Sequence, residues 1–81
     1  MKVRVQFYAQ LRDLTRVESV DADLADGVNV STLLQELYLK FPALRVHDQT
    51  ILVGVGVEFV DRNYIVKTGD EIAIMPPVQG G

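Results

Sequence analysis

The sequence closes with Gly69-Asp70-Glu71-Ile72-Ala73-Ile74-Met75-Pro76-Pro77-Val78-Gln79-Gly80-Gly81. Gly and Asp are turn residues, so Gly69-Asp70 predicts a turn. Residues 71–75 then place Ile72 and Ile74 on one face, which predicts the last strand. The rest of the chain is expected to hold this strand and aim the segment that follows it.

Upstream, residues 2–8 alternate strictly between apolar and polar side chains, which predicts a half-buried strand. Residues 9–15 predict one or two helical turns, because Leu11 and Leu14 lie three positions apart. A second strand is expected at about residues 17–22. It is weakly patterned, and its acidic side chains are typical of an edge strand blunted by charge.

The longest periodic segment predicts the main helix, beginning after Asn29, a plausible N-cap. It should end near Lys40, because Pro42 disfavours helical geometry at the residue before it. The apolar stripe that packs on the sheet comprises Val30, Leu33, Leu34, Leu37 and Phe41.

Residues 43–50 are polar and irregular and predict a surface loop. Residues 51–60 predict a third strand, with Leu52, Gly54 and Gly56 on one face and Val53, Val55 and Val57 on the other. Two glycines on one face suggest a bulge or the close approach of another backbone. Residues 64–66 predict a further short strand.

The element order β-(short α)-β-α-β-β-β indicates an α+β protein, with a mixed sheet and one main helix packed on one face. A β-grasp fits this order, with the first strand central and parallel to the last and a short helix after the first strand. Residues 1–75 are expected to form a single domain, and residues 76–81 an extended, flexible C-terminal tail.

The amino-acid composition argues against several classes of function. The 81 residues include no Cys and one His (His47), which argues against disulfides, zinc-thiolate sites and a bound metal. The net charge is −3 and the basic residues are scattered singly, so no nucleic-acid partner is expected. No apolar run approaches the ~20 residues of a membrane span, and no signal peptide is visible. These features predict a cytoplasmic protein without a membrane partner.

The tail is suited to carrying an acyl group. Pro76 and Pro77 favour an extended exit, and residues 76–81 reach at most ~20 Å. Gly80 and Gly81 lack a Cβ and fit a narrow channel. A carboxylate at Gly81 is inert until it is activated, for example as an adenylate. The chain has no Gly-rich phosphate-binding loop, so a separate activating enzyme is required. The alternative is that the glycine pair is disordered or a cloning remnant.

Two motifs carry a family resemblance. The run Phe7-Tyr8-Ala9-Gln10-Leu11-Arg12-Asp13-Leu14 and the closing Gly69-Asp70-Glu71-Ile72-Ala73…Pro76-Pro77-Val78-Gln79-Gly80-Gly81 resemble the two ends of the molybdopterin synthase small subunit, a ubiquitin-like sulfur carrier. Two departures are Gly56, where relatives usually have Asn, and Met75, where an aromatic residue is common. Gly56 therefore supplies no Asn hydrogen bond, whereas an apolar Met can still pack against a partner.

The resemblance implies a pathway for sulfur. An E1-like enzyme adenylates Gly81, and a sulfurtransferase converts it to a thiocarboxylate. The large synthase subunit then takes up the tail within a heterotetramer, and the sulfur passes to a cyclic pyranopterin in molybdenum cofactor biosynthesis. The chain is then a non-catalytic, sulfur-donating subunit with no permanent cofactor and only transient AMP and sulfur on Gly81. Val78 and Gln79 complete the tail.

Partner contacts are expected at Phe59 and Met75 beside Pro76 and Pro77, although core packing is the alternative for the first two. Arg12 is a candidate for pairing with an acid of the activating enzyme, but a solvated arginine is the commoner outcome. The lesser expectations are a solvated His47, packing roles for Tyr8 and Tyr38, and a turn role for Asp70-Glu71.

Other functions remain open at this point. A thiamine-pathway sulfur carrier is disfavoured, because those chains are usually shorter and lack the segment at residues 8–12. A protein modifier ligated through Gly81 requires the same tail. A plain binding module with an incidental tail is the remaining alternative.

Overall fold

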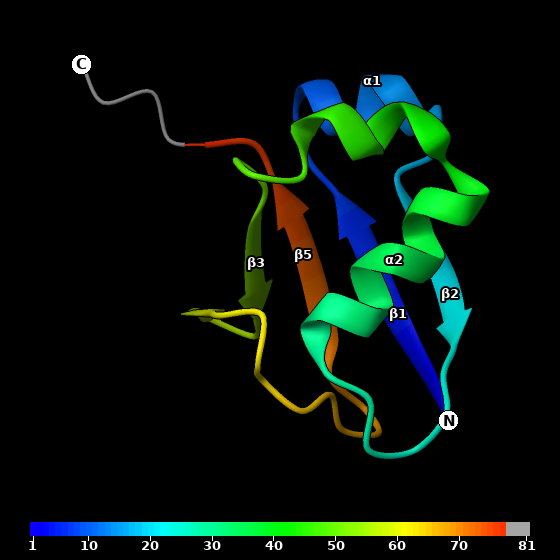
Figure 1. The fold of residues 1–81 in the computed structure, drawn as a ribbon, viewed down its shortest axis with the longest axis vertical. Coiled ribbons are helices and arrows are strands. Elements are labelled where there is room, and N and C mark those ends of the chain that lie inside the picture. Colours follow the sequence, from blue (N-terminus) through cyan, green and yellow to red (C-terminus); the bar gives the residue numbers. More distant parts are fainter. Residues whose placement is uncertain (78–81) are drawn as a thin grey trace.

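The fold is an open five-stranded sheet with its helices on one face (Figure 1). The computed structural model describes residues 1–77. Its elements are β1 (Lys2–Phe7), α1 (Gln10–Thr15), β2 (Ser19–Asp23), α2 (Val30–Lys40), the 3₁₀ helix η1 (Pro42–His47), β3 (Leu52–Val55), β4 (Glu58–Val60) and β5 (Glu71–Met75). The strand order is β2-β1-β5-β3-β4, in which only the β1–β5 pair is parallel. This arrangement confirms the predicted β-grasp.

The core lies between the sheet and α2. Alternation along β1 turns Val3, Val5 and Phe7 inward, and β5 adds Ile72 and Ile74, all buried. The buried side chains of the predicted helix stripe are Val30, Leu33, Leu34 and Leu37. Burying an aliphatic side chain of this size stabilises the fold by about 1.5–3 kcal/mol.

α2 begins and ends where its signals predict. The Asn29 side-chain oxygen accepts a hydrogen bond from the Thr32 amide at 3.0 Å, which satisfies one free donor of the first turn. Phe41 ends the helix ahead of Pro42 and packs edge-on against Phe7, with ring centroids 5.4 Å apart.

β2 starts two residues later than predicted. The chain leaves α1 through Arg16 in a left-handed conformation, and the Thr15 hydroxyl donates to the Val17 carbonyl at 3.0 Å. These contacts hold residues 16–18 in a turn. β2 is nevertheless the edge strand that its charges predicted.

The predicted surface loop at 43–50 is wrong in part, because residues Pro42–His47 form η1. Leu44 is fully buried and anchors this helix to the core. A 3₁₀ helix has three residues per turn, so one buried leucine in a polar run carries no α-helical periodicity.

The predicted single strand at 51–60 is also wrong, because it folds as the hairpin of β3 and β4. Gly56 turns the chain with φ +60°, and Val57, beside it in the turn, is fully exposed. A positive φ at the first turn residue suits Gly, and Asn tolerates it better than most side chains. Residues 64–66 form no strand. Ile65 makes only an isolated bridge to Asn29.

A polar junction ties the hairpin side of the molecule to α2. Tyr38 Oη donates to Asp48 Oδ1 at 2.6 Å, and Arg62 Nη1 donates to the same oxygen at 3.0 Å. The hydrogen bond from Tyr38, followed by that from Arg62, lowers the pKa of the Asp48 carboxyl. Burial, reinforced by Asp48, raises the pKa of Tyr38.

We expect Asp48→Ala to lower the free energy of unfolding at pH 7 by about 1–2 kcal/mol, a modest loss because Asp48 is partly exposed. The pKa of Asp48 is depressed in the folded state. Its stabilisation is therefore present above the unfolded pKa of about 3.9 and is lost as the pH falls through the folded pKa. Urea denaturation at pH 7 and below pH 4 measures this.

The difference between the parent and Asp48→Ala should shrink at the lower pH. Tyr38→Phe is the control: it removes one donor but keeps the carboxylate, so it should cost less. A difference that stays constant across this pH range would contradict the ionic role of Asp48.

Candidate functional site

The face of the sheet opposite α2 carries the candidate site. The strand register places Gln6, Ala73, Gly54 and Phe59 side by side across β1, β5, β3 and β4. Directly opposed residues point to the same face of a sheet. Ala73 and Gly54 are small, so the middle of this row is low and the larger side chains around it stand higher.

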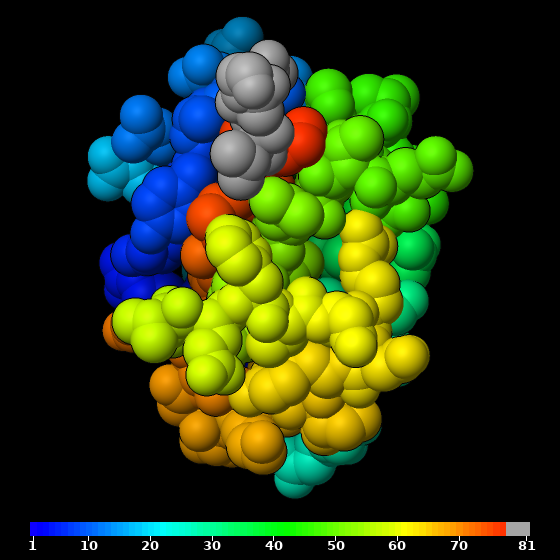
Figure 2. All heavy atoms as spheres, turned by 90° about the vertical axis from the view of Figure 1, so that its left-hand side faces the viewer, coloured from blue at the N-terminus to red at the C-terminus, as the bar shows by residue number. Residues whose placement is uncertain are grey.

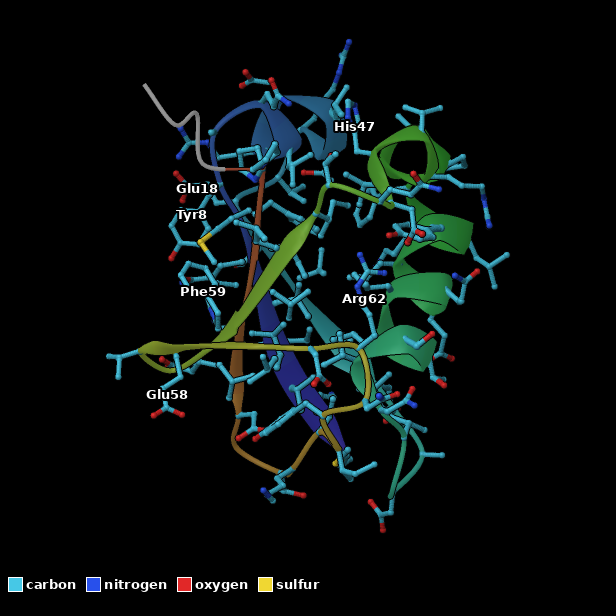
Figure 3. All side chains as sticks on the ribbon, turned by 60° about the vertical axis from the view of Figure 1, so that its left-hand side comes forward. Tyr8, Glu18, His47, Glu58, Phe59 and Arg62 are labelled. Carbon is cyan, nitrogen blue, oxygen red and sulfur yellow. The ribbon has the colours of Figure 1, made fainter. Side chains whose placement is uncertain are left out.

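We call this surface the outer-face patch. It encloses a shallow depression of about 330 Å³. Its apolar members are Tyr8, Gly54, Val57, Phe59, Ala73 and Met75. Figure 2 shows the face formed by β3, β4 and the end of β5, and in Figure 3 Tyr8 and Phe59 lie on the same side of the sheet.

Phe59 is 65% exposed, so the core-packing alternative is wrong for this residue, and the partner contact stays a prediction. Tyr8 is 43% exposed and its hydroxyl donates to Gln6 Oε1 at 2.8 Å. Met75 is half-buried. Clustered exposed apolar side chains are typical of a protein-interaction surface.

β5 anchors the predicted tail at the rim of the outer-face patch. It is hydrogen-bonded to β1 on one side and β3 on the other, so it cannot shift without breaking two ladders. Pro76 follows half-buried and Pro77 is exposed. The tail residues predicted to do the chemistry lie outside the described residues: Val78, Gln79, Gly80 and Gly81.

The turn ahead of β5 is built as predicted. Gly69 has φ +87°, and Asp70 Oδ2 accepts from the Lys67 amide and the Tyr64 hydroxyl, each at 2.9 Å. The bond to Asp70 raises the pKa of Tyr64. Asp70 therefore serves the turn, and it holds the entry to β5.

Arg12 lies apart from Phe59 and Met75. It lines a separate polar groove beside Tyr8, and its guanidinium is 3.8 Å from Glu18 Oε1, with the side chain half exposed. The structure thus brings two of the three predicted interface residues together. It adds Tyr8, Gly54 and Val57, which the sequence did not mark as contacts. The two glycines on one strand face had marked the position of Gly54. Val57 was missed because the turn that exposes it was predicted to be part of a continuous strand.

The two hairpin glycines should respond differently to alanine. A Cβ at Gly54 would lie 3.2 Å from Met75 Cε, a flexible methyl that can move, so Gly54→Ala should change the free energy of unfolding by at most about 1 kcal/mol. Gly56 has φ +60°, where a residue with a Cβ is strained, so Gly56→Ala should cost about 1–2 kcal/mol.

Thermal unfolding of the two variants measures this order, and the Met75 methyl resonance should shift only in Gly54→Ala. The reverse order of stabilities would contradict the assigned backbone conformations.

The outer-face patch is lined mainly by apolar side chains. Within residues 1–77, no three His, Asp or Glu side chains gather as metal ligands. None of the helices in that part of the chain is long and apolar enough to cross a membrane. The outer-face patch offers apolar contact area and a directed chain exit. These are features of a surface that binds another protein.

A β-grasp protein with an exposed apolar surface beside the exit of its last strand and a Gly-Gly ending belongs to the ubiquitin-like class. The chain belongs to the ThiS family, whose sequence profile matches residues 5–81.

The alignments with the following relatives extend over the whole chain. The molybdopterin synthase sulfur carrier subunit of Arabidopsis thaliana is 32% identical over 81 residues, covering 100% of this chain and 84% of the relative. That of Mycobacterium tuberculosis is 28% identical over 82 residues, covering 100% and 99%. The crystal structure of SAMP1, small archaeal modifier protein 1, from Haloferax volcanii superposes with a TM-score of 0.86 at 28% identity, covering 100% of both chains.

Proposed function

We propose that this chain is the sulfur carrier subunit of molybdopterin synthase, with Gly81 as the sulfur-bearing residue. The observation that carries the proposal is the outer-face patch at the root of the tail, on a chain whose curated relatives bear that name. The tail supplies the reactant, and the patch supplies the contact that docks it.

In this proposal the Gly81 carboxylate is first activated, then converted to a thiocarboxylate, and finally gives up its sulfur. ATP converts the carboxylate to an acyl adenylate with release of pyrophosphate. The persulfide of a sulfurtransferase then displaces AMP and forms an acyl disulfide. A thiol cleaves its S–S bond, which releases the thiocarboxylate and leaves a disulfide between the two sulfurtransferase-side sulfurs. Transfer of that sulfur to the pterin, with oxygen from water, regenerates the carboxylate. Glycine obstructs attack at its carbonyl carbon least, since it has no side chain.

The partners follow from this sequence of steps. An E1-like adenylating enzyme and the large synthase subunit each need the same tail, so they bind it in turn. The outer-face patch gives both a common docking surface, with Phe59 and Met75 as the contact side chains. In this proposal Arg12, in the neighbouring groove, exchanges Glu18 for an acid of the activating enzyme.

A second function is a protein modifier linked through Gly81 to lysine side chains. The likeness to SAMP1 over the whole chain favours it. Both functions begin with the same adenylate and diverge at the nucleophile, which is sulfur in one case and an amine in the other.

Mass spectrometry of the full chain purified from cells with intact sulfur transfer tests the proposal. A fraction heavier by one oxygen-to-sulfur exchange, lost when Gly81 is deleted, is the expected result. High-mass conjugates that disappear with Gly81 would support the modifier instead. Finding neither species would overturn the carrier proposal.

A further inference from the structure

The second open edge of the sheet lies at β2, two strands from β5. In the strand order β2-β1-β5-β3-β4, β2 and β4 are the two edges, and the outer-face patch lies at the β4 side. Figure 1 shows β2 at the margin of the sheet with α2 alongside it. An edge strand presents backbone groups that another strand can pair with.

The register identifies which backbone groups are free. The Phe7 amide donates to the Glu18 carbonyl at 2.9 Å, and Met1 and Leu24 exchange hydrogen bonds at the other end, each at 2.7 Å. Hydrogen-bonded pairs alternate in an antiparallel ladder, so Val20 and Ala22 also face β1. The amides and carbonyls of Ser19, Asp21 and Asp23 therefore point away from the sheet.

A groove runs beside this edge, between β2 and α2. Its apolar lining is Val20, Ala22, Leu24, Leu33 and Leu37. The volume is about 170 Å³, below the roughly 300–1,000 Å³ of pockets that hold drug-sized molecules. A depression of this size takes a protruding side chain of a strand that lies along β2.

The charged residues at the β2 edge favour some partner strands over others. The charged residues next to the groove are Asp21, Asp23, Glu36 and Lys40. The strand register puts the Asp21 and Asp23 side chains on the outer face of the sheet, opposite Arg4 and Lys2, so these carboxylates meet only the outward-facing side chains of a strand added at β2. A second copy of β2 would bring like charges together, which destabilises cross-strand pairs. A strand with lysine or arginine beside its apolar residues would meet opposite charge instead.

We propose that the β2 edge and the adjoining groove bind an extended, basic peptide segment of a partner protein by strand addition. Backbone pairing with Ser19, Asp21 and Asp23 supplies the main contacts, and an apolar side chain enters the groove. Because this edge is opposite the outer-face patch, such a partner can hold the chain while the tail is engaged elsewhere. The proposal does not depend on the chemistry assigned to Gly81.

The probe is an end-capped peptide of alternating valine and lysine, long enough to span β2, added to the full chain. Amide hydrogen exchange by NMR should show the outward amides of Ser19, Asp21 and Asp23 protected by about tenfold or more at saturation. The amides of Val20 and Ala22, already bonded to β1, should not change. A peptide with glutamate in place of lysine should bind at least about tenfold more weakly.

Variants locate the site. Asp21→Lys should weaken binding of the lysine peptide by about two- to fivefold, because Asp21 lies on the face to which the peptide lysines point. Glu58→Lys makes the same charge change on β4 and should leave the affinity unchanged. Protection at β4 instead of β2, equal binding of the two peptides, or absence of protection at the outward amides would each overturn the proposal. So would self-association through β2 in the absence of peptide.

Discussion

Deletion of Gly81 is expected to reduce sulfur transfer to a pterin acceptor by at least about 100-fold while leaving the fold intact. One residue fewer draws the terminal carbonyl back by about 3.3–3.6 Å, and displacements of even 1 Å can cost about 100-fold in rate. The assay combines the chain, the proposed activating enzyme, a sulfur source and the large subunit, and it measures conversion of the pterin. Addition of one glycine should have an effect of the same size, because it misplaces the same atom.

The free energy of unfolding should change by less than about 0.5 kcal/mol in both tail variants, because residues 1–77 already make up the core and the sheet. Leu34→Ala provides the comparison, since this fully buried side chain should cost about 2–5 kcal/mol. A tail deletion that destabilises the chain as much as Leu34→Ala would contradict a purely functional tail.

Phe59→Asp is expected to weaken binding of the large subunit by about 30-fold or more. Aromatic side chains at the centre of an interface often contribute at least 2 kcal/mol, and a carboxylate would be buried in place of the ring. The side chain is 65% exposed in the free chain, so folding should be nearly unaffected. Titration calorimetry with the large subunit measures the change.

Val46→Asp is the matched control for Phe59→Asp. Val46 is 84% exposed and lies on η1, outside the outer-face patch, so the same introduction of a carboxylate should leave the affinity unchanged. Equal losses in the two variants would show that the effect is general electrostatics rather than a contact at the outer-face patch.

The periodic elements were predictable because their signals are local. Alternation along β1 and β5 and the stripe of α2 each depend on residues a few positions apart, and burial follows the same spacing. Asn29 and Pro42 set the ends of α2 through contacts within a single turn. The parallel pairing of β1 with β5 followed from the element order.

The errors fall where local signals conflict. Residues 51–60 are rich in valine and suggest one continuous strand, whereas the positive φ of Gly56 turns them into a hairpin. η1 was missed because its one buried residue, Leu44, is fixed by contact with the core rather than by a repeat. Both outcomes depend on where the neighbouring elements lie.

The sequence by itself determined the periodic strands and helix, and it points to the Gly-Gly ending as the chemical group. Covalent order and side-chain spacing are sufficient for these features. Only the tertiary structure decided which residues share a surface: Tyr8, Gly54, Phe59 and Met75 come from four parts of the chain and meet through strand register. It also decided that the outward backbone of β2 is unpaired within residues 1–77, because a strand has a free edge only in relation to its neighbours.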